Sequence, residues 1–301
     1  MFRSPRLATV VILAALEACR PARPARAPSP APPSATRAFL VREAQLEGGA
    51  VSVHAEIPLE PAGPKPTVIA LLGDSRALLA AGFVVVTYQI QWAILKGEKP
   101  PAPPPEGTGV GKWVLAAPSA ATIGEGYLRQ IAATAAEHVP KILDYLATIP
   151  EVDTGRIGMA GGSTNGFVAL EAAAADRRIR AAVAIAACGD YRTFLRYSSM
   201  GMEGKPLALD PAYAAWIQDH EPIAHPDRVV HAALLMRNRV GDPLIPIACA
   251  DRTARVLAAA YTRAGVSERF RYDRLDAEGH GLDPDDGRAA VAWFARWLTG
   301  S

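Results

Sequence analysis

The stretch "AGGSTNGF", residues 160–167, decides how the rest of this chain is interpreted. An apolar segment with the composition of a strand, 156–160, runs into it, and a segment with the composition of a helix, 167–174, runs out of it. Small residues around a serine are typical of a strained strand–turn–helix junction that projects the hydroxyl above a sheet. The helix dipole and the backbone amide of Thr164 would then point at any oxyanion formed there.

The match to the pattern G-x-S-x-G is loose, because Asn165 stands where the second glycine is expected. Asparagine tolerates unusual φ values better than most residues, but its side chain is expected to crowd the strand–helix junction. The alternative for Ser163 is an ordinary serine cap at the start of a helix. The choice between a nucleophile and a helix cap therefore depends on whether the chain also offers a base and an acid that could act with Ser163.

A serine nucleophile needs a base, and the base needs an acid that orients it. Asp242 lies in "RNRVGDPLIPI" and His280 lies between two glycines in "DAEGHGLDPDDG", each following an expected strand. Because ligands bind at the carboxyl ends of parallel strands, both residues are expected at the sheet edge that carries Ser163. Asp190, in "CGD", is the alternative acid. Taken singly, each of these residues is also an ordinary turn or cap residue.

Apolar and helical segments alternate along the chain after residue 38. Strands are expected at 39–45, 51–57, 67–72, 83–88, 156–160, 181–187, 232–236 and 269–275, and helices at 123–147, 164–176, 249–264 and 287–298. Several strands are apolar on both faces, so the sheet should be covered on both sides. The first two strands, joined through "EGGA", predict an antiparallel edge hairpin. The alternation predicts an α/β domain with a doubly wound, mostly parallel sheet.

Residues 190–230 are longer than a strand connection requires. An insertion at the carboxyl end of a strand overhangs the ligand-binding edge of such a sheet, which predicts a lid. Phe194, Tyr197 and Trp216 would give this lid an apolar wall suited to an acyl or aromatic group, or they merely pack the insertion onto the domain. Three cations of the segment either bind a substrate carboxylate or are solvated surface: Arg192, Arg196 and Lys205.

Three segments together resemble the α/β-hydrolase superfamily, in its dienelactone-hydrolase-like and prolyl-oligopeptidase-like branch. They are "DYLATIPEVDTGRIGMAGGSTNGFVAL", "HEPIAHPDRVVHAALLMRNRVGDPLIP" and "AEGHG" with "AVAWFARWL", and the resemblance covers most of residues 38–299. The resemblance implies that Ser163 is the nucleophile, His280 the general base and then acid, and Asp242 the orienting carboxylate. It also implies hydrolysis of esters, or of peptides in some members, without a metal or an organic cofactor.

The sequence departs from this superfamily at the second donor of the oxyanion hole. Members usually have "HG" after the third strand, whereas this chain reads Leu72-Gly73-Asp74-Ser75. The amide of Gly73 or Asp74 is expected to join that of Thr164 as the second donor. The connection from Gly73 to the next strand is also short, so the first helix should be truncated.

Three functions remain open at this stage. The first is a serine hydrolase that cleaves small carboxylic esters, and the second is a peptidase or acyltransferase with the same residues. Small esters are favoured over peptides because the chain is too short to hold the propeller of full-size prolyl oligopeptidases. The third is a catalytically weak binding protein with the hydrolase fold, since loss of one oxyanion donor costs roughly 10²–10³ in rate.

The N-terminal segments have the composition of a leader and a tether. Residues 1–19, "MFRSPRLATVVILAALEAC", combine two arginines with a short apolar run, which is typical of an export signal. The ending at Cys19 resembles a bacterial lipoprotein signal, although Glu17 departs from that pattern. Residues 20–37 are rich in proline and alanine and predict an extended tether before a domain at 38–301. We expect a periplasmic, secreted or lipid-anchored protein, with membrane contact only through Cys19; the alternative is an apolar N-terminal helix.

Charge and cysteine content add two further expectations. The first 37 residues carry six arginines and one glutamate, so the formal charge of +2 leaves the remainder near −3. This remainder offers no basic surface for nucleic acid, and the expected partner is a small-molecule ester. Cys188 and Cys249 would be able to pair in an exported protein, but two separate, buried thiols are the favoured interpretation.

Overall fold

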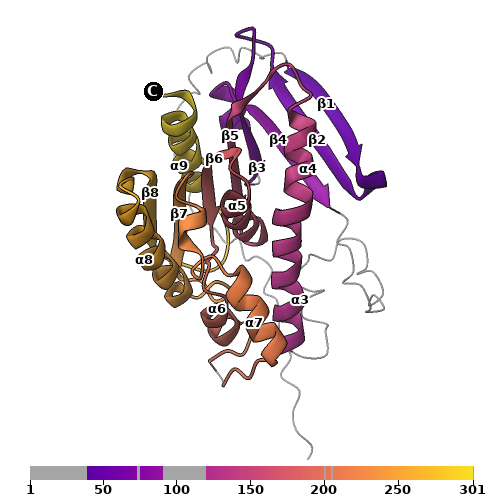
Figure 1. Cartoon of the computed structure of the whole chain (residues 1–301). Coiled ribbons are helices and arrows are strands. Elements are labelled where there is room, and N and C mark those ends of the chain that lie inside the picture. The colour runs from indigo at the N-terminus through magenta and orange to yellow at the C-terminus, as the bar shows by residue number, and fades with distance from the viewer. Residues whose placement is uncertain (1–38, 73–74, 91–119, 200, 205, 301) are drawn as a thin grey trace, which may run out of the picture. The chain divides into compact units, whose positions relative to one another are not determined.

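The computed structural model describes residues 39–72, 75–90, 120–199, 201–204 and 206–300. Eight strands of this part form one sheet (Figure 1). They are β1 (Phe39–Leu46), β2 (Val51–Pro58), β3 (Lys65–Leu71), β4 (Val84–Ile90), β5 (Val152–Gly162), β6 (Ile179–Ile185), β7 (Ala233–Gly241) and β8 (Phe270–Glu278). All eight strands expected from the sequence are present.

The strand order is β1-β2-β4-β3-β5-β6-β7-β8. β1 and β2 form the expected antiparallel edge hairpin, and β2 also runs antiparallel to β4. All further pairs, from β4 with β3 to β7 with β8, are parallel. The central strands are almost wholly apolar because helices cover both faces of the sheet there.

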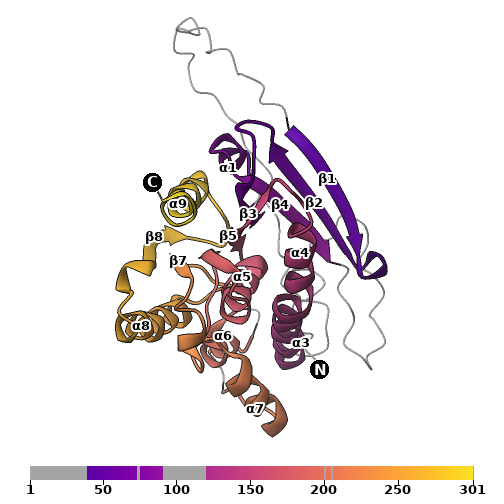
Figure 2. The same cartoon turned by 45° about the horizontal axis from the view of Figure 1, so that its top comes forward.

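The helices of the described part are α1 (Arg76–Ala80), α3 (Ala120–Ala133), α4 (Val139–Leu146), α5 (Thr164–Ala175), α6 (Tyr191–Tyr197), α7 (Pro211–His220), α8 (Ile247–Arg263) and α9 (Pro284–Phe294). Short 3-10 turns lie at η1 (Glu47–Gly49), η3 (Pro226–Arg228) and η4 (Ser267–Arg269), and π turns at η2 (Thr134–His138) and η5 (Ala295–Thr299). α1 and α9 pack together on one face of the sheet, and α4, α5 and α8 lie on the other (Figure 2). The four expected helices and the truncated first helix are confirmed. None of the described helices has both the length and the apolar composition needed to cross a bilayer.

The helix expected at 123–147 is interrupted by a π turn. Residues 134–138 form η2, which joins α3 to α4. Pro140 follows two residues later, at the start of α4. Because proline has no N–H to donate to the preceding turn, the regular hydrogen-bond ladder cannot continue through this point, and a wider turn absorbs the break.

The last two strands are longer than their apolar segments indicated. β7 continues five residues beyond Met236 to Gly241, and β8 continues to Glu278, because the two strands go on pairing with each other as far as Gly241 and Glu278. Asp242 therefore lies directly after β7, and His280 lies two residues beyond β8. This pairing brings the two candidate residues to the same edge of the sheet.

Cys188 and Cys249 form a disulfide, so the favoured interpretation of two separate thiols was wrong. Their Cα atoms are 5.8 Å apart, within the usual range for such a bond. Cys188 follows β6 and Cys249 lies near the start of α8, two elements that the parallel sheet places next to each other. Sequence separation of 61 residues hides this proximity, which arises only when β6 and β7 pair.

Removing this bond is expected to lower stability without changing the fold. In the oxidised chain the loop between the cysteines spans 61 residues, and its closure restricts the unfolded ensemble. We expect the Cys188→Ala/Cys249→Ala variant to lose about 3–4 kcal/mol of unfolding free energy in urea titrations. Reduction of the wild type should produce the same loss and should leave the variant unchanged. Equal stability of the wild type and the variant, each measured with and without reductant, would contradict the expectation.

Candidate active site

A strained junction carries Ser163 between β5 and α5. Its backbone angles are φ 55° and ψ −126°, in a region that residues other than glycine rarely occupy. The Ser163 N–H donates to the carbonyl of Ile185 on β6 at 2.9 Å, which fixes the junction against the neighbouring strand. The hydroxyl thus projects from the carboxyl edge of the sheet at the start of α5.

Two glycines allow this tight turn. A Cβ on Gly161 would overlap the backbone of Asn165, and a Cβ on Gly166 would lie 2.5 Å from the carbonyl oxygen of Ile185. Asn165 itself is half-buried. The expected crowding at Asn165 is thus relieved because Gly161 has no side chain and because Gly166, one residue later, makes the close approach to β6.

A hydrogen-bonded chain joins the three residues selected from the sequence. The Ser163 hydroxyl lies 2.9 Å from His280 Nε2, and His280 Nδ1 lies 2.8 Å from Asp242 Oδ2. The other carboxylate oxygen, Asp242 Oδ1, accepts the N–H groups of Leu244 and Ile245 at 2.9 and 3.0 Å. The Asp242 side chain is 1% exposed, whereas that of His280 is 21% exposed. An ionised carboxylate only accepts, so His280 carries its proton on Nδ1 and Nε2 is left to accept from serine.

This arrangement can activate a hydroxyl. Imidazole in this tautomer takes the serine proton as serine attacks an electrophilic carbon, and the buried carboxylate stabilises the imidazolium that results. Two backbone donors lock the carboxylate, so its orientation is set before any ligand arrives. Ser163 and His280 are each partly exposed, as contact with a ligand requires.

Thr164 is the first residue of α5, where backbone N–H groups have no partner within the helix. Its amide and the positive end of the α5 dipole therefore face the space beside the Ser163 hydroxyl. Gly73 and Asp74, proposed from the sequence as the second donor, lie outside the described residues. Of the expected oxyanion donors, Thr164 is the one within the described part of the chain.

Two side chains that the sequence did not single out also border the site. The hydroxyl of Tyr127, on α3, lies 3.0 Å from Thr164 Oγ1, and burial raises the pKa of Tyr127 to about 12, so it stays protonated at neutral pH. Leu282, 40% exposed, covers Gly162 directly beside the serine. No pattern in the sequence around Tyr127 pointed to the site, whereas Leu282 could have been found from its position two residues after His280.

The predicted lid residues lie in different surroundings. Phe194 is 1% exposed and packs edge-on against Phe167 of α5. Of the two alternatives expected for it, Phe194 therefore packs the insertion onto the domain and does not form a ligand-binding wall. Trp216 stacks between Tyr213 and His220 on α7 and is half-buried. Tyr197 is 46% exposed at the end of α6. Among these three side chains, only Tyr197 presents a large apolar surface to solvent.

Asp190, the alternative acid, has a structural position. Its carboxylate caps α6 by accepting the N–H of Thr193 at 3.1 Å and the Thr193 hydroxyl at 2.6 Å. The same carboxylate lies 3.3 Å from Nε of Arg252. Those contacts occupy Asp190, whereas the contact with His280 Nδ1 belongs to Asp242.

The insertion is attached to α5, the helix that begins after Ser163, by a buried polar contact. Tyr191 of α6 donates its hydroxyl to Glu171 of α5. Burial raises the pKa of Glu171 to about 7 and raises that of Tyr191 as well, so at neutral pH Tyr191 keeps its proton and Glu171 is partly protonated. This contact anchors the first turn of α6 to the helix that follows Ser163.

The sequence matches no protein-family model and is similar to no curated protein. Solved structures are similar in fold. A puromycin-hydrolysing peptidase of Mycobacterium tuberculosis has a TM-score of 0.61 and 17% identity over 87% of this chain and 39% of its own. This chain thus spans about two fifths of that peptidase.

Two other solved structures match over most of both chains. A protein of Thermus thermophilus has a TM-score of 0.54 and 22% identity, over 86% of this chain and 98% of its own. A glucuronoyl esterase of Solibacter usitatus has a TM-score of 0.54 and 15% identity, over 89% of this chain and 87% of its own. The strand order, the junction at Ser163 and these similarities together show that the described part of the chain has the α/β-hydrolase fold.

Proposed function

We propose that this chain is a serine hydrolase that cleaves carboxylic esters through an acyl-enzyme on Ser163. The observation that carries the proposal is the continuous hydrogen-bonded chain from the Ser163 hydroxyl through His280 to the buried Asp242. The named activities of two similar structures, a peptidase and an esterase, support the class of reaction.

The reaction follows from the positions of these atoms. Ser163 Oγ attacks the acyl carbon while His280 Nε2 takes its proton, and the Thr164 amide donates to the oxyanion of the tetrahedral intermediate. The intermediate collapses when imidazolium returns the proton to the leaving alkoxide, which departs as an alcohol. Water then attacks the acyl-enzyme with His280 as base, and the acid leaves as Ser163 regains its proton. Asp242 remains ionised and holds the ring throughout.

Leu282 supports an ester with an apolar acyl group. Its exposed side chain lies over Gly162, beside the nucleophile, and offers an apolar surface to a bound acyl chain. Peptide hydrolysis is the second candidate, because a peptidase has a TM-score of 0.61 to this chain. Acyl transfer, or ligand binding with little turnover, would use the same residues.

Matched substrates separate these activities. We expect turnover of 2-naphthyl esters of short and medium acyl chains, with little turnover of 2-naphthylamides that carry the same acyl groups. An added alcohol should compete with water without becoming the preferred acceptor. Faster hydrolysis of the amides would favour the peptidase, and preferred formation of the new ester would favour the transferase. Turnover of neither series by a protein that binds them would favour the binding protein.

We further propose that the chain is exported, with residues 1–19 as the signal and Cys19 as a site of lipid attachment. The disulfide between Cys188 and Cys249 supports an oxidising compartment, where such bonds persist. Residues 1–38 lie outside the described part of the chain. Fractionation of cells that produce the full chain tests this proposal, and recovery in the cytoplasm with both cysteines reduced would contradict it.

A further inference from the structure

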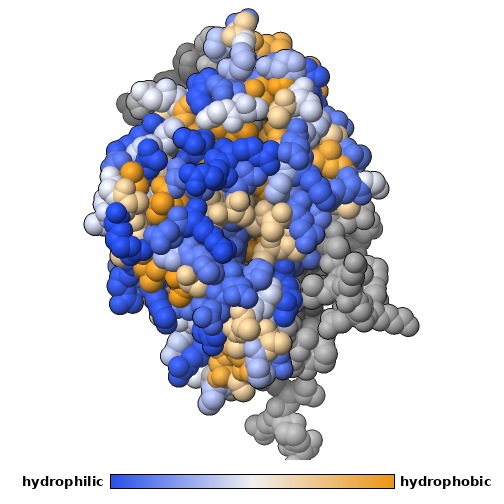
Figure 3. Space-filling model, in the orientation of Figure 1, coloured by the Kyte–Doolittle hydropathy of each residue, from blue (hydrophilic) through white to orange (hydrophobic). Residues whose placement is uncertain are grey.

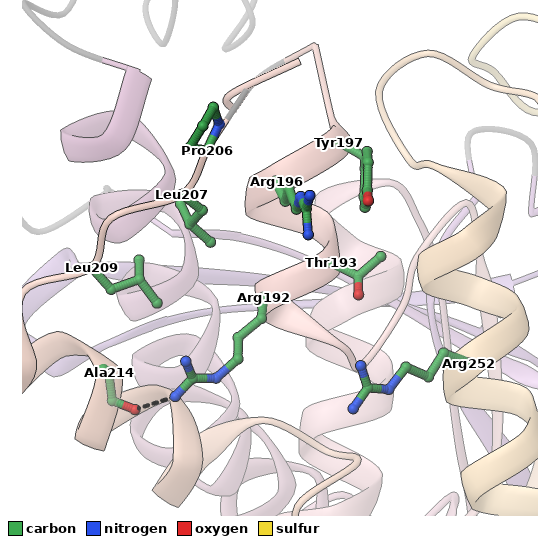
Figure 4. Close-up of a pocket in the computed structure, with 9 residues that line it drawn as sticks. All are labelled: Arg192, Thr193, Arg196, Tyr197, Pro206, Leu207, Leu209, Ala214 and Arg252. Carbon is green, nitrogen blue, oxygen red and sulfur yellow. Dashed lines mark hydrogen bonds between the residues drawn. The ribbon is translucent and has the colours of Figure 1, made fainter. Parts of the chain in front are cut away.

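The insertion borders a cavity of about 770 Å³ that is partly open to solvent and lies between α6, α7, α8 and residues 206–209 (Figure 4). Its volume lies within the usual range of small-molecule sites. The cavity is lined by none of the residues Ser163, Asp242 and His280. It is thus a separate feature of the described residues, which the proposed hydrolysis does not use.

Three arginines line this cavity from two helices. Arg192 and Arg196 extend from α6, and Arg252 extends from α8 (Figure 4). An arginine carries five N–H donors, of which few are used here. Arg192 donates to the carbonyl of Ala214 at 3.1 Å, Arg252 is paired through Nε with Asp190, and the Arg196 guanidinium lies 5.0 Å from the centre of the Tyr197 ring.

Two carboxylates lie near these cations, and they do not cancel the charge. Asp190 is 1% exposed and is occupied by Thr193 and Arg252. Glu221 accepts the N–H of Tyr191, and burial together with the neighbouring Asp190 raises the pKa of Glu221 to about 7. Three guanidinium groups therefore lie near two carboxylates, neither of which lines the cavity, so the cavity keeps a positive excess.

The opposite wall is apolar. Leu207 and Leu209 come from the segment before α7, together with Pro206, and they face the arginines across the cavity (Figure 4). Both leucines are half-buried and pack against the core, so this wall is held in place. Figure 3 shows polar and apolar residues mixed over this face, with one apolar group at the end of the molecule that carries α6 and α7. One side of the cavity therefore matches an anion, and the other matches hydrocarbon.

We propose that this cavity binds a small molecule that carries an oxyanion head group, a carboxylate or a phosphate monoester, on an apolar chain or ring. Guanidinium forks recognise both head groups through paired N–H···O bonds. Three such forks from two helices line the same cavity, and the leucine wall accepts the apolar part. This site lies beyond the proposed hydrolysis and does not depend on it.

The cavity is physically attached to the segment that holds Asp242. Immediately after Tyr197, the Ser198 hydroxyl donates to the carbonyl of Leu244 at 2.6 Å, and the Ser199 N–H donates to the carbonyl of Pro243 at 3.0 Å. A ligand that contacts Tyr197 therefore lies next to the turn that holds the orienting carboxylate.

Binding is measured by titration calorimetry on the Ser163→Ala protein, so that hydrolysis cannot interfere. The probes share one chain length: octanoate, octyl phosphate and octanamide. We expect at least one of the two anions to bind at least about tenfold more tightly than the neutral amide. Octanoate alone, octyl phosphate alone, or both would each support the site and would identify its preferred head group. Equal binding of all three probes, or binding of none, would overturn the proposal.

Paired variants test whether the arginines are responsible. The change Arg192→Gln/Arg196→Gln removes two cations from the cavity, and the control Arg180→Gln/Arg255→Gln removes two exposed cations outside it. We expect an affinity loss of about tenfold or more in the first protein and less than about twofold in the control. Equal losses of affinity in the two proteins would show that the anions are held by general charge attraction, which would overturn the proposal.

A third variant addresses the apolar wall. Leu207→Ser should weaken octanoate while leaving acetate binding unchanged, because acetate has no chain to place against that wall. An equal effect on both anions would show that the wall is not used and would contradict the proposed ligand class. Thermal unfolding of each variant provides the check on folding. Binding is read without turnover, so these outcomes are distinct from a failure of the proposed hydrolysis.

Discussion

A fluorophosphonate is expected to add one mass increment to the purified chain and none to its Ser163→Ala variant. The Ser163 hydroxyl lies 2.9 Å from His280 Nε2, on a backbone held at φ 55°, and the start of α5 is aimed at the developing charge. Loss of such a nucleophile lowers kcat by about 10⁶ in a comparable serine hydrolase. Intact-mass spectrometry checks the adduct, and ester hydrolysis checks the rate.

Ser199 offers a matched control. It is exposed and lies next to the turn that carries Asp242, but its N–H bonds to Pro243 and no histidine is paired with it in the described residues. Ser199→Ala should label as fully as the wild type, whereas His280→Ala should label no more than Ser163→Ala. Labelling that survives the change at Ser163, or a wild type that stays unlabelled beside a reactive control hydrolase, would turn the interpretation toward a binding protein.

The second large effect is expected from Asp242→Asn. Asp242 Oδ1 accepts two backbone N–H groups, so the oxygen of asparagine must keep that position and its amide nitrogen must face His280 Nδ1. The ring is then forced to carry its proton on Nε2, where it can no longer accept the proton of Ser163. We expect ester hydrolysis and fluorophosphonate labelling to slow by about 10⁴ at neutral pH. Stopped-time labelling and initial rates provide the measurement.

Asp190→Asn is the comparison for this change. The Asp190 side chain is as buried as that of Asp242 and also accepts a backbone N–H, that of Thr193, but it caps α6 instead of contacting His280. Asparagine is an equally good cap, so the rate should fall by less than about tenfold. A cost at Asp190 equal to that at Asp242 would show that the effect comes from disturbing the insertion and not from the tautomer of His280.

Local composition was sufficient for the elements of this fold. Apolar runs without alternation predicted the central strands, and "EGGA" predicted the hairpin, because burial on both faces and tight turns leave direct marks in neighbouring residues. Their ends were less well predicted. β7 and β8 extend each other by pairing, so the polar residues between Met236 and Gly241 belong to a strand that their composition does not indicate.

The candidate site divides in the same way. Ser163 was visible from its small neighbours, and the positions of Asp242 and His280 after strands were visible from the alternation. The place of Tyr127 beside the site could not be predicted, because its approach to Thr164 depends on how α3 packs across α5. The bond between Cys188 and Cys249 was likewise hidden by 61 residues of chain.

The sequence by itself determined the parallel sheet, the strained junction at Ser163 and the positions of Asp242 and His280 after their strands. Each of these depends on the chemistry of adjacent residues. Only the tertiary structure decided the distances among Ser163, His280 and Asp242, the partner of each cysteine and the meeting of Arg192 with Arg252 around one cavity. These depend on strand pairing and helix packing between segments far apart in the chain, and no local pattern encodes a distance of that kind.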